Sequence, residues 1–122
     1  MTAHNGPCHP DLELRVTING EVIIGPVQAM LLEAIHFTGS ISAAHRKLGV
    51  SYAHLWKMVA ALNDVFSPPL IDPVRGGARG GGAVLTPEGH KILGSYRRLE
   101  ELSHKVARTQ LLVISNAVGK DR

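Results

Sequence analysis

The stretch from Gly39 to Phe66 limits the possible folds of this chain more than any other. Ser40 is suited to cap a helix, because its hydroxyl can accept a hydrogen bond from a free backbone N–H of the first turn. Apolar side chains then recur on one face until Gly49, whose missing Cβ allows the left-handed backbone of a sharp reversal. Ser51 can cap a second, longer helix. The pattern predicts a helix-turn-helix, in which a turn of about three residues joins two helices.

The second helix of this pair has two different faces. Its apolar stripe consists of Leu55, Val59, Leu62 and Phe66. Its opposite face carries Ala53, His54, Lys57, Ala61 and Asp64. Such a face can enter a groove of a nucleic acid, although an ordinary pair of packed helices is the alternative interpretation. Trp56 flanks the stripe, where a large ring is more often a packing residue than a binding residue.

A basic, glycine-rich hairpin follows the second helix. Residues 70–74 and 83–85 predict two short strands, and the segment RGGARGGG at 75–82 lies between them. Without Cβ atoms its backbone can approach a phosphate closely, while Arg75 and Arg79 supply charge-assisted contacts. A merely flexible loop is the alternative. A nucleotide-binding loop is disfavoured, because no Lys-Ser or Lys-Thr pair follows the glycines.

A long helix closes the chain. Thr86, Pro87 and Glu88 supply a cap, a proline for the first position and an acid against the positive helix end. Helical character continues to about Ile114, a length of roughly 40 Å, which exceeds the need of a small domain. Apolar residues recur at seven-residue spacing, namely Ile92, Leu99, Val106 and Val113, with Leu102 between them. The spacing predicts a dimerisation helix that pairs with a second copy.

The N-terminal part predicts a β-hairpin and a further helix. Apolar and polar residues alternate from Leu12 to Ile18, as in a half-buried strand, and Asn19-Gly20 is a strong hairpin signal before the partner strand at 21–24. Pro26 then suits the first position of a helix that stops near Gly39. The inward-facing residues expected from its spacing are Val27, Met30, Leu31, Ala34 and Ile35.

The charge of the chain is unevenly distributed. Residues 1–74 carry four Lys or Arg against six Asp or Glu, and residues 75–122 carry nine against four, so the two parts have net charges of −2 and +5. A basic surface of this kind suits a polyanion, and nucleic acid is the partner that it favours. At 122 residues the chain has room for one domain. We expect a disordered arm at 1–11, the domain at 12–115 and a frayed tail at 116–122.

Several other classes of protein and site are disfavoured. The lone Cys8 excludes an internal disulfide, and the polar N-terminus lacks the apolar stretch of a signal peptide, so we expect a cytoplasmic protein. The apolar runs at 22–24 and 111–114 are far shorter than the roughly 20 residues of a membrane span. His4, Cys8 and His9 lack a fourth ligand and a fixed geometry, so neither a metal site nor a cofactor is expected.

Two segments together carry a resemblance to a known family. The run from Gly39 through Trp56, followed by GGARGGGAVLTPEG at 76–89, resembles the DNA-binding domain of the molybdate-responsive ModE repressors. The N-terminal domain of LysR-type regulators is similar at a greater distance. The likeness covers roughly residues 12–110. The glycine-rich hairpin, or wing, that runs into AVLT is specific to the family together with the spacing of Ser51-Tyr52 and Trp56. It implies a mostly α winged helix-turn-helix with small β elements, whose dimer places the second motif helix in the major groove and the wing on the backbone or minor groove.

The sequence departs from this family in two ways. Members commonly have a basic residue directly after the Ser-Tyr pair, where this chain has Ala53, so the family's operator sequence does not carry over. Larger members continue into C-terminal oxyanion-binding domains. The sequence up to Arg122 has none, so no molybdate binding is expected on this chain.

These observations predict a homodimeric regulator that binds double-stranded DNA. The candidate DNA-binding residues are Ser51, Tyr52, Ala53, His54 and Lys57 on the second motif helix, Arg46 and Lys47 on the first, and Arg75 and Arg79 in the wing. The alternative is a winged-helix module that docks a partner protein, and salt-dependent DNA binding would separate the two. An enzyme is disfavoured, because no nucleophile, base and orienting group occur at informative spacing.

Overall fold

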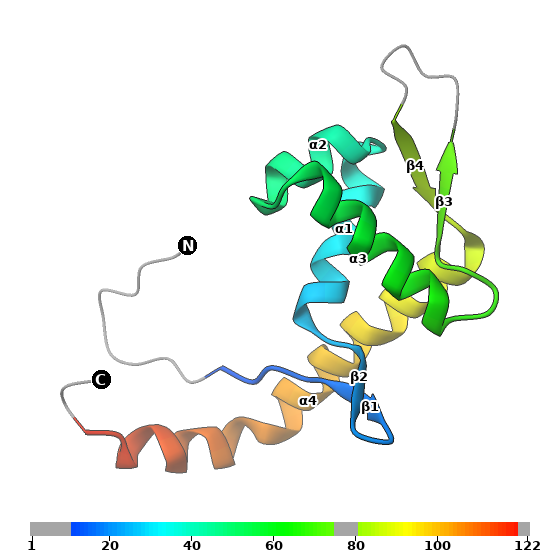
Figure 1. Ribbon diagram of the computed structural model, residues 1–122. Coiled ribbons are helices and arrows are strands. Elements are labelled where there is room, and N and C mark those ends of the chain that lie inside the picture. Colours follow the sequence, from blue (N-terminus) through cyan, green and yellow to red (C-terminus); the bar gives the residue numbers. More distant parts are fainter. Residues whose placement is uncertain (1–10, 75–80, 120–122) are drawn as a thin grey trace.

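The computed structural model describes residues 11–74 and 81–119 of the 122-residue chain. Within these residues the chain forms four helices and four short strands. The strands are β1 (Val16–Ile18), β2 (Glu21–Ile24), β3 (Ile71–Val74) and β4 (Gly82–Leu85). The helices are α1 (Pro26–Thr38), α2 (Ile41–Leu48), α3 (Tyr52–Val65) and α4 (Pro87–Ala117). The predicted winged helix-turn-helix with an N-terminal β-hairpin is therefore confirmed, and Figure 1 shows its β3–β4 wing beside α2 and the β1–β2 hairpin at the other end of the body.

Helix α1 lies at the centre of the core and contacts α2, α3, α4, β2 and β4. Its fully buried side chains are Ala29, Leu31, Leu32, Ala34 and Ile35. Among the described residues no charged side chain is buried, so the core is stabilised mainly by the burial of apolar side chains.

The prediction of which α1 residues face inward is partly wrong. Val27 and Met30 are 57% and 52% exposed, whereas Ala29 and Leu32 are fully buried. Periodicity locates an apolar side of a helix, but neighbours on several sides bury a wider arc than one stripe. The elements around α1 cover the side with Ala29 and Leu32. They do not cover the edge with Val27 and Met30, which therefore stays exposed.

The N-terminal hairpin is shorter than predicted. Asn19 and Gly20 have φ values of 52° and 83°, as the expected tight turn requires, and β1 pairs antiparallel with β2. However, β1 begins at Val16 instead of Leu12, and its register shifts after Val16. Residues 12–15 have no strand partner because β2 ends at Ile24, where α1 is about to begin.

Helix α4 begins as predicted and extends slightly further. The Thr86 hydroxyl accepts a hydrogen bond from the Gly89 N–H at 3.0 Å, and Pro87 occupies the first position. The helix continues to Ala117 instead of ending near Ile114. Its 31 residues give a length of roughly 46 Å. Figure 1 shows the first part of α4 against the body and its C-terminal part running away from the other helices.

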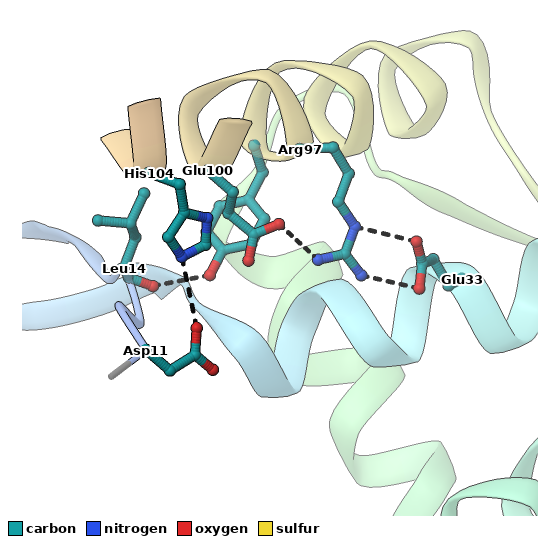
Figure 2. Close-up of polar contacts among 7 residues, drawn as sticks. Asp11, Leu14, Glu33, Arg97, Glu100 and His104 are labelled. Carbon is teal, nitrogen blue, oxygen red and sulfur yellow. Dashed lines mark hydrogen bonds and ion pairs between the residues drawn. The ribbon is translucent and has the colours of Figure 1, made fainter. Parts of the chain in front are cut away.

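Polar contacts fasten the middle of α4 to the rest of the domain (Figure 2). The Tyr96 hydroxyl donates to the Leu14 carbonyl at 2.7 Å, and burial raises the pKa of this phenol. Arg97 makes two contacts with the Glu33 carboxylate of α1, at 2.9 and 2.7 Å, and this hydrogen bonding raises the pKa of its guanidinium. These contacts tie α4 to α1 and to the segment before β1.

None of the helices in the described part of the chain combines the length and the apolar character that a membrane-crossing segment needs.

Candidate nucleic-acid interface

The starts of α2 and α3 are capped by local hydrogen bonds that the sequence predicted. The Ser40 hydroxyl accepts from the Ala43 N–H, and the Ser51 hydroxyl accepts from the His54 N–H, each at 3.0 Å. Gly49 has a φ of 72°, a left-handed conformation that an L side chain rarely adopts. Both helices therefore have fixed starting points, and α3 has a defined direction relative to α2.

Helix α3 presents the predicted candidate residues to solvent. The core buries Leu55, Val59 and Leu62 on its inner side. The candidate residues on the outer side are all exposed, namely Ser51, Tyr52, Ala53, His54 and Lys57. The structure thus brings these five together along the first two turns of one helix, at the position from which a helix-turn-helix protein reads DNA.

A row of rings flanks this face, and His45 is the one member to which the sequence had assigned no role. The His45 ring lies edge-on to Tyr52 with centroids 5.7 Å apart, and Tyr52 lies edge-on to Trp56 at 6.3 Å. His45 also places its Nδ1 atom 3.0 Å from the Val50 carbonyl oxygen in the turn. Trp56 packs partly against the core, which agrees with the packing role expected for it. The exposed Tyr52 is thereby held between two neighbouring rings.

Two further candidates lie at the end of α2. Arg46 and Lys47 are exposed in its last turn, where the negative end of the helix dipole favours cations. The Arg46 guanidinium lies 3.4 Å from the Ser42 hydroxyl. Between Glu33 and Asp64 the chain has three Lys or Arg residues and no carboxylate side chain. The motif helices therefore present a positive surface.

The wing is attached directly to the start of α2. Strands β3 and β4 pair antiparallel, with Ile71 opposite Leu85 and Val74 opposite Gly82. The Ile41 N–H donates to the Gly81 carbonyl at 2.7 Å, which joins the returning strand to α2. Arg75 and Arg79 fall outside the described residues, as do His4, Cys8 and His9 of the rejected metal site.

The role of one residue at the base of the wing was not predicted from the sequence. Asn63 of α3 makes three hydrogen bonds with the backbone of Leu70 and Ile71, at 2.8 to 3.0 Å. Its position gave no signal, because an asparagine late in an amphipathic helix is usually a solvated residue. Only the fold reveals its partners.

A comparison with protein families matches residues 27–90 to the bacterial regulatory helix-turn-helix proteins of the lysR family. The chain belongs to the lysR family. The match covers more than half of the sequence, from the start of α1 to the first turn of α4, and it includes the whole of the motif and the wing. The more distant of the two resemblances read from the sequence is therefore confirmed.

Curated relatives support the resemblance to ModE proteins as well. The molybdenum-pterin-binding protein MopB of Rhodobacter capsulatus is 46% identical over 77 residues, covering 63% of this chain and 28% of MopB. The DNA-binding transcriptional dual regulator ModE of Escherichia coli K12 is 30% identical over 95 residues, covering 78% of this chain and 36% of that protein. This lysR-family chain thus spans only about a third of the length of such relatives.

A solved structure shares the fold. Full-length CbnR, crystallised in complex with its target DNA, superposes with a TM-score of 0.52 at 26% identity, covering 69% of this chain and 27% of CbnR. A second structure of CbnR describes it as a LysR family transcriptional regulator and superposes at 0.51. The similarity agrees with the family assignment.

Proposed function

We propose that this chain is a sequence-specific regulator of transcription that binds double-stranded DNA as a homodimer. The observation that carries the proposal is the exposed face of α3, a capped helix backed by the core, which presents Ser51, Tyr52, Ala53, His54 and Lys57. A positive surface around it suits the phosphate backbone. ModE of Escherichia coli is named as a DNA-binding regulator and CbnR was crystallised with its target DNA, which supports the same role here.

In this proposal α3 enters the major groove, where its first turns meet base edges. The Ala53 methyl group can contact a thymine methyl but cannot read guanine. Ser51, His54 and Lys57 contact base edges or nearby phosphates, and Tyr52 contributes from the edge of the same face.

Other basic residues position the protein without reading sequence. We assign phosphate contacts to Arg46 and Lys47 at the end of α2, because both are exposed beside the recognition face. For Arg75 and Arg79 the assignment of contacts rests on the sequence. Glycine neighbours do not fix a side chain firmly enough for base reading, so phosphate or minor-groove contacts are assigned to them.

The homodimer is formed through the exposed stripe of α4. Val106 and Val113 are 82% and 60% exposed, and Leu99 and Leu102 are more than 40% exposed. A second copy of the helix would remove this apolar surface from water. The organisation proposed with it keeps 12–115 as the domain, together with the last two residues of α4, which ends at Ala117. Residues 1–11 are assigned to an arm, and those after α4 to a tail. The regulator acts in the cytoplasm and catalyses no reaction.

Base reading by α3 is tested by changing its first turn. Ala53→Arg should change the preferred base in each half-site, with a discrimination of roughly 1–3 kcal/mol if the guanidinium contacts guanine with two hydrogen bonds. The measurement is fluorescence anisotropy on operator and base-substituted duplexes. An unchanged preference would contradict the assigned orientation of α3.

The wing is tested in the same assay by a different readout. Replacing both Arg75 and Arg79 with alanine should weaken binding to operator and scrambled duplexes alike. The plot of log affinity against log salt should flatten by roughly 0.9 for each lost phosphate contact. Loss of operator binding alone would mean that the wing reads sequence.

A further inference from the structure

Asn63 uses its whole side-chain amide to bind the chain that leads into the wing. Its Oδ1 atom accepts hydrogen bonds from the N–H groups of Leu70 and Ile71, both at 3.0 Å. Its Nδ2 group donates to the Ile71 carbonyl at 2.8 Å. An amide side chain can both accept and donate in this manner, whereas a carboxylate can only accept.

The backbone that Asn63 binds is also the meeting point of β3, β4 and α4. Ile71 is the first residue of β3, and the Leu70 carbonyl accepts from the Thr86 N–H at 2.9 Å. The Thr86 hydroxyl donates to the Pro69 carbonyl at 2.7 Å and also caps α4. The side chains of Leu70 and Ile71 are almost completely buried. The position of this short segment therefore sets where the wing leaves the body.

Asn63 is the side chain that links this segment to α3. Among the residues that the structure describes, no other side-chain hydrogen bond joins α3 to β3 or to the segment before it. Asn63 lies on the same helix as Lys57, about 1.7 turns further along. A rigid connection thus runs from the exposed face of α3 to the base of the wing.

We propose that Asn63 is a positioning residue that sets the wing in register with α3, so that both elements contact one DNA site at once. This proposal rests on the proposed DNA-binding function. Without the three hydrogen bonds, the core still holds α3 through Leu55 and Val59, but the start of β3 loses its hydrogen bonds to the helix. The wing then contributes less to binding, although its own residues are unchanged.

The test is a double-mutant cycle between Asn63 and the wing. We compare the wild type, Asn63→Ala, the variant with alanine at both Arg75 and Arg79, and the combined variant, on one duplex at several salt concentrations. Loss of two phosphate contacts corresponds to a slope change of about 1.8 and a roughly 60-fold loss of affinity at 0.1 M salt. Asn63→Ala should produce most of this change. The combined variant should bind no more weakly than the wing variant.

Lys57→Ala serves as the reference for independent effects, because its side chain belongs to the proposed recognition face. Its effect should add to that of Asn63→Ala. Tyr96→Phe removes one hydrogen bond far from the wing and should leave the salt slope unchanged, which separates positioning from general destabilisation. If Asn63→Ala does not fold, Asn63→Asp replaces it, since the aspartate keeps both acceptor bonds and loses only the donor to Ile71.

The outcomes are distinguishable. If the wild type binds DNA but the affinity losses of Asn63→Ala and of the wing variant simply add, the positioning role alone is overturned. Absence of salt-dependent DNA binding by the wild type would overturn the proposed function and this inference with it. Amide hydrogen exchange of Leu70 and Ile71 in the free protein provides a readout without DNA, and Asn63→Ala should accelerate it while Tyr96→Phe does not.

Discussion

The two parts of α4 differ sharply in their contacts. In the first part, Gly89 and Tyr96 are buried, and Arg97 binds Glu33 of α1. After His104, which lies 3.4 Å from Asp11, no side-chain hydrogen bond or ion pair is present within the described residues. Valine and isoleucine side chains in this second part nevertheless remain largely exposed.

The comparison indicates two different roles for one helix. Contacts with α1, β4 and the segment before β1 make the first part a member of the folded domain. The second part receives no such stabilisation, and apolar side chains repeated on one stripe are unfavourable in water unless something covers them. The proposed pairing with a second copy would cover this stripe.

The largest expected effect comes from substitutions that disrupt only the second part of α4. Replacing Val106 and Val113 with glutamate should separate the dimer, because each valine contributes roughly 1.5–3 kcal/mol when buried and a charge opposes burial. Sedimentation equilibrium measures the dissociation constant, and Arg108→Glu places the same carboxylate on the opposite face as a control. The free energy of unfolding of the monomer should not change. A dimer that survives both substitutions would place the interface elsewhere.

The next largest effect comes from a substitution that disrupts the packing of the first part of α4. A Cβ at Gly89 would meet the backbone carbonyl oxygen of Leu70, so Gly89→Ala forces a backbone shift and should lower the free energy of unfolding by about 3 kcal/mol. Gly94→Ala is the matched control in the same helix, because no atom lies within 4 Å of its added Cβ. That variant should be more stable by up to about 1 kcal/mol. Chemical denaturation measures both, and equal effects would show that the contact with Leu70 is unimportant.

A smaller effect concerns the hydrogen bond between Tyr96 and Leu14. Tyr96→Phe should cost about 1–2 kcal/mol near neutral pH, because it leaves the Leu14 carbonyl without its donor. Since burial raises the pKa of Tyr96, its contribution is complete below the ordinary tyrosine pKa of about 10 and is lost as the pH rises further. The stability difference between wild type and variant should therefore narrow above about pH 10. A constant difference across that range would contradict the burial of the phenol.

The smallest effect concerns the ion pair between α1 and α4. Both partners are more than a third exposed, so Glu33→Gln should cost only about 0.5 kcal/mol despite the short contacts with Arg97. The loss should shrink at high salt, because screening weakens the pair in the wild type. Urea denaturation at low and high salt checks this, and a loss of several kcal/mol would mean that the pair is an essential link.

The sequence predicted those parts of the fold whose determinants are local. Ser40, Gly49, Ser51 and Thr86 cap or end helices through groups within a few residues, so both ends of α2 and the starts of α3 and α4 followed from short patterns. The exposed α3 face followed from the position of its apolar stripe.

Contacts distant in sequence were not predictable in this way. Tyr96 finds its partner 82 residues away, and the need for glycine at position 89 arises from the backbone of a different element. The exposure of Val27 and Met30 depends on which neighbours surround α1, and no periodicity encodes that. Asn63 likewise has a recognisable role only once the start of β3 is placed beside it.

Selection of bound sequences from random duplex DNA by the purified protein tests the central claim most directly. Two copies joined through α4 and reading DNA with α3 should enrich an inverted repeat, with half-site centres about one helical turn or a multiple of it apart. The variant with glutamate at Val106 and Val113 should lose the repeat. Failure of the wild-type protein to enrich any sequence, or enrichment of a single site without symmetry, would contradict the paired DNA-binding function.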